Sequence, residues 1–146
     1  MDTDLARLLE PWPAADRDEQ AFPFVTVDEA GYPHVMLLST AELLPAGGEL
    51  LVAIASVTAR ANLARTGTAT LVAADGTAAH YAKLRVRATA EHSGFAVLTC
   101  EVVWHKRDSL GIPLHPMEFR ATAEVADGER WTVTRAALLA RREGAR

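Results

Sequence analysis

The chain has a single cysteine among its 146 residues, which excludes an intramolecular disulfide framework. Cys100 lies in the apolar run Ala96–Trp104, so we expect a buried, inert thiol rather than a nucleophile. The N-terminal segment MDTDLARLLEPW carries acidic residues and no long apolar run. It therefore predicts neither a signal peptide nor a membrane span, and we expect a cytoplasmic location.

An excess of basic charge is also missing. Nineteen acidic residues against fifteen lysines and arginines give a net charge of −4. Nucleic-acid-binding domains usually carry a basic stripe, so this balance argues against a nucleic-acid partner. The glycine-rich loops of dinucleotide folds and P-loop proteins are absent too, and no Ser/His/Asp arrangement can be placed. These patterns point to no catalytic side chain.

The histidines lack the spacing of metal ligands. His80, His92, His105 and His115 have no partner cysteine or aspartate cluster nearby in the sequence, so we predict no metal site. His34 differs because it lies inside an apolar stretch. A lone histidine in that setting is more often a core or interface residue than a catalytic one.

Short apolar or alternating segments, bounded by turn residues, make up most of the chain. The composition is 49% apolar and 23% charged, which is typical of a globular protein, and the length predicts a single domain spanning 1–146. We expect strands over Phe22–Val27, Tyr32–Thr40, Glu49–Ala55, Thr68–Ala74, Ala78–Glu91, Phe95–Trp104, Glu118–Val125 and Trp131–Thr134. We expect helices over Leu5–Glu10 (capped by Thr3 or Asp4), Thr58–Arg65 (ended by Gly67) and Arg135–Glu143 (capped by Thr134). Asp16–Gln20 is expected to be a connector and Lys106–Pro116 irregular.

This pattern predicts a mainly β fold with small helices. The strands and their hairpin turns indicate a closed or nearly closed antiparallel barrel of six to eight strands, with a Greek-key-like order. A β-sandwich is the alternative. The capped helix between the strands Glu49–Ala55 and Thr68–Ala74 favours the barrel, because a sandwich has no need of it.

Hydroxyl groups and an arginine gather where one of these strands leads into that helix. The segment reads Ser56-Val57-Thr58-Ala59-Arg60-Ala61-Asn62-Leu63. Free backbone N–H groups and the positive end of the helix dipole favour an anion at such a place. The simpler interpretation is that Thr58 only caps the helix, that Arg60 is solvated and that Asn62 is structural.

The order of the motifs resembles the FMN-binding split barrels of the pyridoxamine 5′-phosphate oxidase-like superfamily. The resemblance is carried by the hairpin Phe24–Val35, the strand Leu51–Ala55, the segment Ser56-x-Thr58-x-Arg60-x-Asn62-Leu63, the strand Gly67–Val72 and the strand His80–Val86. The chain has Val57-Thr58-Ala59 where the biosynthetic oxidase carries Ser-Arg-Lys, and it lacks a C-terminal motif for a substrate phosphate. We therefore do not expect it to be that oxidase.

The resemblance implies an FMN-dependent oxidoreductase that is a homodimer and acts on a small molecule. It implies that Ser56, Thr58 and Arg60 lie near the flavin phosphate and that His34, Val35 and Met36 lie along the flavin ring, with Lys83 as a further polar contact. Lys83, Arg85 and Arg87 form either a polar wall beside the cofactor or a solvated sheet face. A deazaflavin- or haem-handling split barrel, or a non-enzymatic dimer that has lost its cofactor, are the alternatives.

Overall fold

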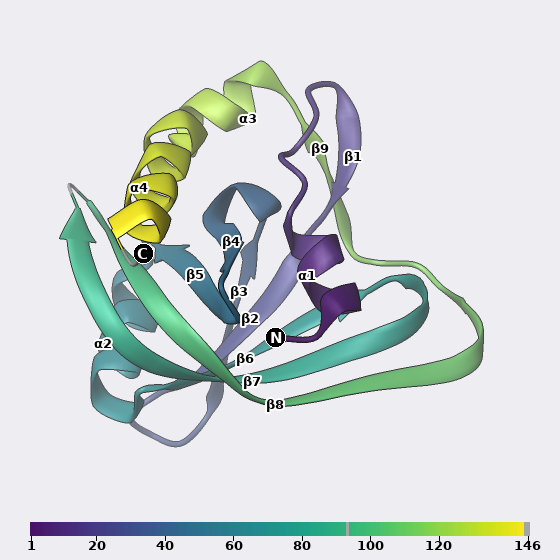
Figure 1. The fold of residues 1–146 in the computed structure, drawn as a ribbon, viewed down its shortest axis with the longest axis horizontal. Coiled ribbons are helices and arrows are strands. Elements are labelled where there is room, and N and C mark those ends of the chain that lie inside the picture. Colours follow the sequence, from purple (N-terminus) through teal and green to yellow (C-terminus); the bar gives the residue numbers. More distant parts are fainter. Residues whose placement is uncertain (93, 145–146) are drawn as a thin grey trace.

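Antiparallel strands form most of the chain, with short helices between and around them (Figure 1). The computed structural model describes residues 1–92 and 94–144. Its helices are α1 (Thr3–Leu9), α2 (Val57–Thr66), α3 (Ala123–Gly128) and α4 (Trp131–Gly144), with a 3-10 helix η1 (Thr40–Glu42). Its strands are β1 (Arg17–Gln20), β2 (Phe22–Val27), β3 (Pro33–Leu38), β4 (Leu43–Ala46), β5 (Glu49–Ile54), β6 (Thr68–Ala74), β7 (Gly76–His92), β8 (Phe95–Leu114) and β9 (Glu118–Ala121). None of the described helices is long and apolar enough to cross a bilayer.

The main sheet is a curled barrel with an open seam. Within the described residues, seven strands pair in the order β3-β2-β6-β7-β8-β5-β4, while β1 and β9 pair separately. No ladder in that described part joins the edge strands β3 and β4, which only Ser39 and η1 connect along the chain. The register of β7 and β8 shifts at Lys83/Leu84 and at Val86/Ala88, and such bulges bend a hairpin. The predicted split-barrel class is confirmed.

The barrel interior holds the main hydrophobic core. Alternate residues of the strands face it, so Phe22 and Phe24 of β2 are at most 1% exposed and Leu71 of β6 packs with them. Helix α1 adds Leu5 and Leu9 to the same cluster. Each such side chain contributes about 1.5–3 kcal/mol through its burial.

Helix α1 begins earlier than expected. Its N-cap is Asp2, whose carboxylate accepts hydrogen bonds from the backbone N–H of Asp4 and Leu5 at 3.0 and 3.1 Å. The prediction that Thr3 or Asp4 caps this helix is therefore wrong. Several residues near the start have cap chemistry, and the pattern of leucines alone does not choose among them.

The C-terminal part differs most from expectation. The predicted strand Trp131–Thr134 is the first part of α4, and the predicted strand Glu118–Val125 ends at Ala121. Residues Trp131, Thr134, Ala137 and Leu138 are buried at helical spacing. Burial of this face against β4, β5 and β8 outweighs the strand propensity of tryptophan, valine and threonine. Thr134 is thus an interior residue of α4 and not its cap.

Two segments predicted to lack strands are paired. The charged connector Asp16–Gln20 contains β1, which pairs with β9 about one hundred positions further along. The segment expected to be irregular after Trp104 continues β8 up to Leu114, opposite the beginning of β7. Both pairings depend on distant partners, so the local pattern does not reveal them.

Candidate functional site

The predicted anion site lies where β5 ends and α2 begins; we call Ser56, Thr58 and Arg60 the α2 corner. Ser56 is the N-cap of α2, and its Oγ accepts a 3.2 Å hydrogen bond from the N–H of Ala59. Thr58 lies exposed in the first turn, so the interpretation of Thr58 as the cap is wrong. At the other end Gly67 adopts a φ of 67°, as a glycine after a helix often does, which confirms the predicted helix end.

Arg60 is the cation of this corner, and it is paired. Its guanidinium forms an ion pair with Glu91 near the end of β7; the two side chains are 31% and 64% exposed. Arg60 and Glu91 also line a cavity of about 210 Å³ between α2 and the β7–β8 hairpin, beside Leu63 and Val86. An anion that binds Arg60 therefore competes with a carboxylate that solvent already reaches.

Helix α2 is held in place by side-chain contacts to β2. Asn62 donates a 3.0 Å hydrogen bond from its side-chain nitrogen to Thr26 Oγ1, and both residues are buried. The guanidinium of Arg65 donates to the backbone carbonyl of Val27. The structural role expected of Asn62 is confirmed, because its side chain joins α2 to β2.

Five side chains form a row across the outer face of the sheet. The register places Val35 of β3 beside Val25, Val25 beside Thr70, Thr70 beside Lys83 and Lys83 beside Trp104. We call these residues the outer row. The Lys83 ammonium lies 4.8 Å from the centre of the Trp104 ring, a cation–π distance. Val35 and Trp104 are 55% and 44% exposed.

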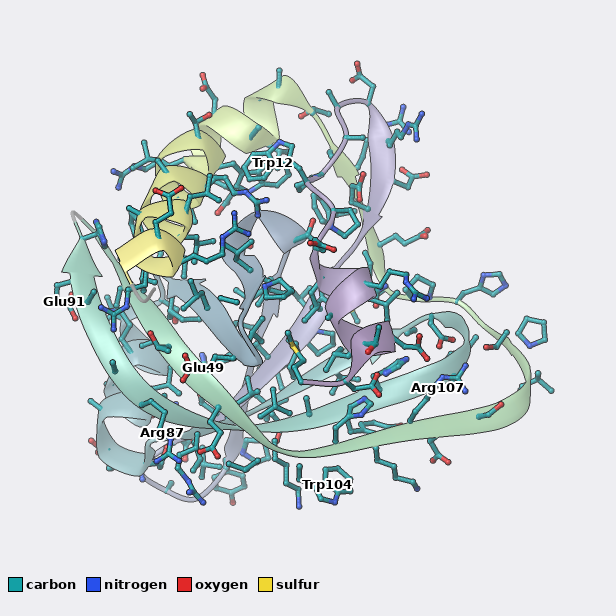
Figure 2. The ribbon with its side chains drawn as sticks, in the orientation of Figure 1. Trp12, Glu49, Arg87, Glu91, Trp104 and Arg107 are labelled. Carbon is teal, nitrogen blue, oxygen red and sulfur yellow. The ribbon has the colours of Figure 1, made fainter. Side chains whose placement is uncertain are left out.

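The outer row adjoins a cavity of about 270 Å³, lined by Val25, Thr70, Lys83 and Val103 among others. Figure 2 shows Trp104 and Arg87 along one border of the β7–β8 hairpin, with Glu91 at its far end. Arg87 and Arg85 both lie beside the carboxylate of Glu101. These two arginines thus belong to a solvated ion-pair network, while Lys83 contacts an aromatic ring.

The residues expected along the flavin ring lie on both faces of the strand β3. His34 and Met36 are half-buried and pair with the buried Thr26 and Phe24, whereas Val35 between them points outward. Met36 packs against the main core. The seven predicted residues thus form three groups: Ser56, Thr58 and Arg60 at the α2 corner, His34 and Met36 on the inner side of β3, and Val35 and Lys83 in the outer row.

The structure also brings together residues that the sequence did not connect. His80, fully buried, lies with its Nδ1 3.0 Å from Nε2 of His105 and its Nε2 3.1 Å from Oδ2 of Asp75. Hydrogen bonds from the N–H of Thr77 and from His80 hold the pKa of Asp75 well below its usual value. Sequence alternation in β7 places His80 on the inner face, but finding His105 beside it requires the continuation of β8, which was not predicted.

Cys100 is buried in the main core. Burial raises the pKa of its thiol to about 12, so it carries no thiolate near neutral pH. The expectation of a buried, inert thiol is confirmed.

No protein-family model matches the chain, and no curated protein matches it in sequence. Solved structures are similar in fold. The flavin reductase of styrene monooxygenase from Pseudomonas putida S12 is 10% identical, with a TM-score of 0.54 over 68% of this chain and 86% of that one. Nitrilotriacetate monooxygenase component B from Mycobacterium thermoresistibile is 10% identical, with a TM-score of 0.56 over 72% of this chain and 77% of that one. An F420 reductase is 9% identical, with a TM-score of 0.50 over 62% of this chain and 91% of that one. At these identities the likeness establishes the split-barrel fold.

Proposed function

We propose that this chain binds FMN as a homodimer and acts as an FMN-dependent oxidoreductase on a small molecule. The observation that carries the proposal is the α2 corner: an exposed hydroxyl, Thr58, and an arginine, Arg60, stand in the first turn of a helix that follows a barrel strand. Two of the solved structures with this fold are a flavin reductase and an F420 reductase.

The chemistry of the α2 corner suits a phosphate. The first turn of a helix leaves backbone N–H groups without intrahelical partners, and these groups favour an anion. Arginine presents a planar fork of donors that matches phosphate oxygens. The competing ion pair with Glu91 is partly exposed, and such pairs contribute only about 0.2–1 kcal/mol. A phosphate that carries more charge than one carboxylate can therefore replace it.

The outer face of the sheet suits an aromatic ring and a second copy of the chain. Val27, Val35 and Leu37 on β2 and β3 are between 39% and 55% exposed, so an apolar surface adjoins the outer row. Exposed apolar patches of this kind mark interaction surfaces. When bound, FMN would supply hydride or electron transfer. Val35 would contact the ring, and Lys83 would place a positive charge near it.

Titration of the chain with FMN tests the proposal. We expect bound FMN to absorb near ~450 nm. Replacing Arg60 by alanine should weaken binding by about 1.5–3 kcal/mol, or roughly 10- to 150-fold, because one charge-assisted contact is lost. Arg120→Ala is the matched control, since it removes another exposed arginine with a carboxylate partner, Asp18, far from the corner. Equal FMN affinity in Arg60→Ala and the unchanged chain would exclude the phosphate assignment.

The F420 reductase with the same fold favours a deazaflavin as the second candidate. A parallel titration with F420 separates the two cofactors. If the chain binds F420 and not FMN, the cofactor is a deazaflavin. The Arg60→Ala variant should then bind F420 more weakly, because the α2 corner would still hold the cofactor. A chain that takes up neither molecule would support a barrel dimer without a cofactor.

A further inference from the structure

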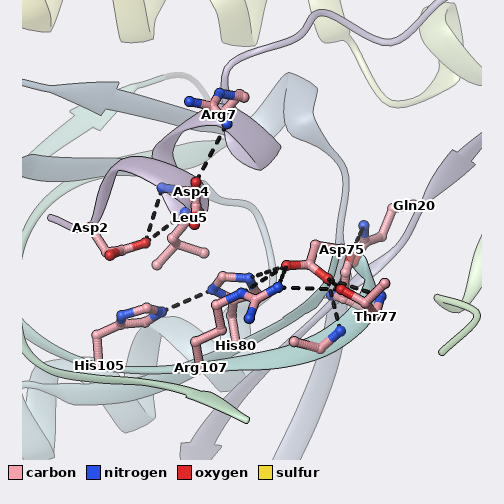
Figure 3. Close-up of polar contacts among 12 residues, drawn as sticks. Asp2, Asp4, Leu5, Arg7, Gln20, Asp75, Thr77, His80, His105 and Arg107 are labelled. Carbon is pink, nitrogen blue, oxygen red and sulfur yellow. Dashed lines mark hydrogen bonds and ion pairs between the residues drawn. The ribbon is translucent and has the colours of Figure 1, made fainter. Parts of the chain in front are cut away.

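Two histidines and two aspartates meet between α1 and the β7–β8 hairpin, away from the α2 corner (Figure 3). One ligand atom each from Asp2, His80 and His105 lies within 4.8 Å of the others. His80 is fully buried, His105 is partly buried and Asp2 is exposed. Side chains of this kind at this separation are able to share one cation.

Asp75 determines which nitrogen of His80 is free. Its Oδ1 accepts hydrogen bonds from the backbone N–H groups of Thr77 and Ala78 at 3.0 and 2.8 Å, and its Oδ2 accepts from the Nε of Arg107 at 3.1 Å. Because these donors stabilise the ionised carboxylate, Asp75 accepts a hydrogen bond from His80 as well. The proton of a neutral His80 therefore lies on Nε2, and the lone pair of Nδ1 points toward His105.

The geometry points to a divalent transition-metal site whose ligands are Asp2, His80 and His105, with Asp75 as the residue that positions His80. Two imidazoles and a carboxylate are a common ligand set for zinc and for non-haem iron. A carboxylate that accepts the other N–H of a metal-bound histidine is a frequent companion of such sites. His80 therefore has a lone pair on Nδ1 in a fixed orientation, as a metal-bound histidine requires.

The two histidine nitrogens already lie near the separation that one ion requires, while the Asp2 carboxylate, within 4.8 Å of them, has to move closer. The two histidine nitrogens are 3.0 Å apart, and a tetrahedral zinc with bonds of about 2.0–2.1 Å separates two nitrogens by roughly 3.3 Å. Without metal, His105 donates its Nε2 proton to His80; with metal, that proton lies on Nδ1 of His105 instead. The two N-cap hydrogen bonds of Asp2 use Oδ1, and Oδ2 is the second oxygen that this carboxylate offers.

A bound ion would join parts of the chain that are distant in sequence. Asp2 caps α1, while His80 and His105 belong to β7 and β8. Three protein ligands leave the fourth position of a zinc ion for water. The site would thus fasten α1 to the hairpin, and metal binding would stabilise the folded chain.

The test uses the full chain, freed of metal with a chelator and titrated calorimetrically with Zn²⁺. We expect one ion per chain and a melting temperature that rises with the Zn²⁺ concentration, because the ion binds the folded state. Asp2→Asn keeps the helix cap, since asparagine caps as well as aspartate, but removes the anionic ligand. His105→Ala removes an imidazole from a partly buried position. Both variants should bind Zn²⁺ at least about 10-fold more weakly.

His115→Ala is the matched control, because it removes an exposed histidine outside the cluster. Asp75→Asn should lower Zn²⁺ affinity by about 10- to 100-fold while it leaves one ion per chain, as expected of a positioning residue. Absence of saturable Zn²⁺ binding would overturn the inference. So would equal Zn²⁺ affinity in the unchanged chain, Asp2→Asn and His105→Ala. Neither result bears on FMN binding at the α2 corner.

Discussion

Asn62 of α2 donates a 3.0 Å hydrogen bond to Thr26 Oγ1 of β2, and both side chains are buried. This contact joins the helix that carries Arg60 to the strand beside β3. It is one of the polar contacts that fix the helix on the barrel, together with the bond from Arg65 to Val27. The position of the α2 corner thus depends on a buried amide rather than on apolar packing alone.

Removing this amide should destabilise the chain. We expect Asn62→Ala to lower the free energy of unfolding by about 1–3 kcal/mol, because the buried Thr26 hydroxyl loses its partner. Urea unfolding at neutral pH measures the change. Replacing Thr26 by valine in the same chain should cost less than the sum of the two single changes, since no unpaired polar group then remains. Additive costs would contradict the pairing.

Releasing Arg60 from its ion pair should strengthen FMN binding. Glu91→Gln removes the carboxylate that competes with a phosphate for the guanidinium. An exposed pair of this kind is worth about 0.2–1 kcal/mol, so FMN affinity should rise by up to roughly fivefold. Fluorescence titration with FMN measures it.

Asp18→Asn is the control, because it frees Arg120 of β9 from a similar exposed pair with a residue of β1. The control should leave FMN affinity unchanged. A fall in FMN affinity on Glu91→Gln would indicate that Glu91 positions Arg60 rather than competes for it.

A charge on the outer face should separate the proposed dimer. Val35→Lys removes the burial of the exposed half of a valine in each copy, worth about 1 kcal/mol per copy. It also places an ammonium among apolar side chains, and burying that charge costs more still. The dissociation constant of the dimer should rise at least about 100-fold. Sedimentation velocity over a range of concentrations measures it.

Val133→Lys provides the comparison, since Val133 is similarly exposed (48%) but lies on α4. This variant should sediment like the unchanged chain. If Val133→Lys dissociates the dimer and Val35→Lys does not, the interface lies on α4 and not on the outer face.

Stability should depend on pH through Glu42. Burial raises the pKa of this carboxyl above its usual value of 4.5, although Ser39 donates hydrogen bonds to it. The folded chain therefore holds the proton more tightly than the unfolded chain does. The stability that Glu42 contributes is present below pH 4.5 and is lost as the pH rises through the raised pKa.

Glu42→Gln should remove this loss, because glutamine preserves the capping box and carries no charge. The free energy of unfolding of the variant, relative to that of the unchanged chain, should be higher at pH 7 than at pH 4. Chemical unfolding at both pH values measures it. Glu118→Gln, at an exposed position of β9, serves as the control. A stability difference that is the same at both pH values would exclude this role for Glu42.

Local patterns predicted the strands of the barrel and the position of the helix α2. Alternating burial marked β2 and β6, whose bounds agree with the prediction, and Gly67 marked the end of α2. These features depend on neighbouring residues, so the sequence displays them directly. Ser56, Thr58 and Arg60 lie close together because they belong to one short segment at the start of this helix.

Features that depend on distant pairing were not predictable. The strand β1 pairs with β9, and the end of β8 pairs with the beginning of β7, and neither partner is near in sequence. The meeting of His80 and His105 depends on the second of these pairings. Likewise, Trp131 and Thr134 have the propensities of strand residues, and only the packing of α4 against β5 and β8 places them in a helix.

The two borders of the open seam also bear on how copies of this chain meet. The edge strand β3 begins at Pro33, and the edge strand β4 contains Pro45. Proline has no N–H to donate, so each border is a poor template for an added strand. The seam is thereby protected against growth into a continuous sheet of many chains. In the homodimer that we propose, the faces of the sheet rather than these two borders are therefore the surfaces left for contact between copies.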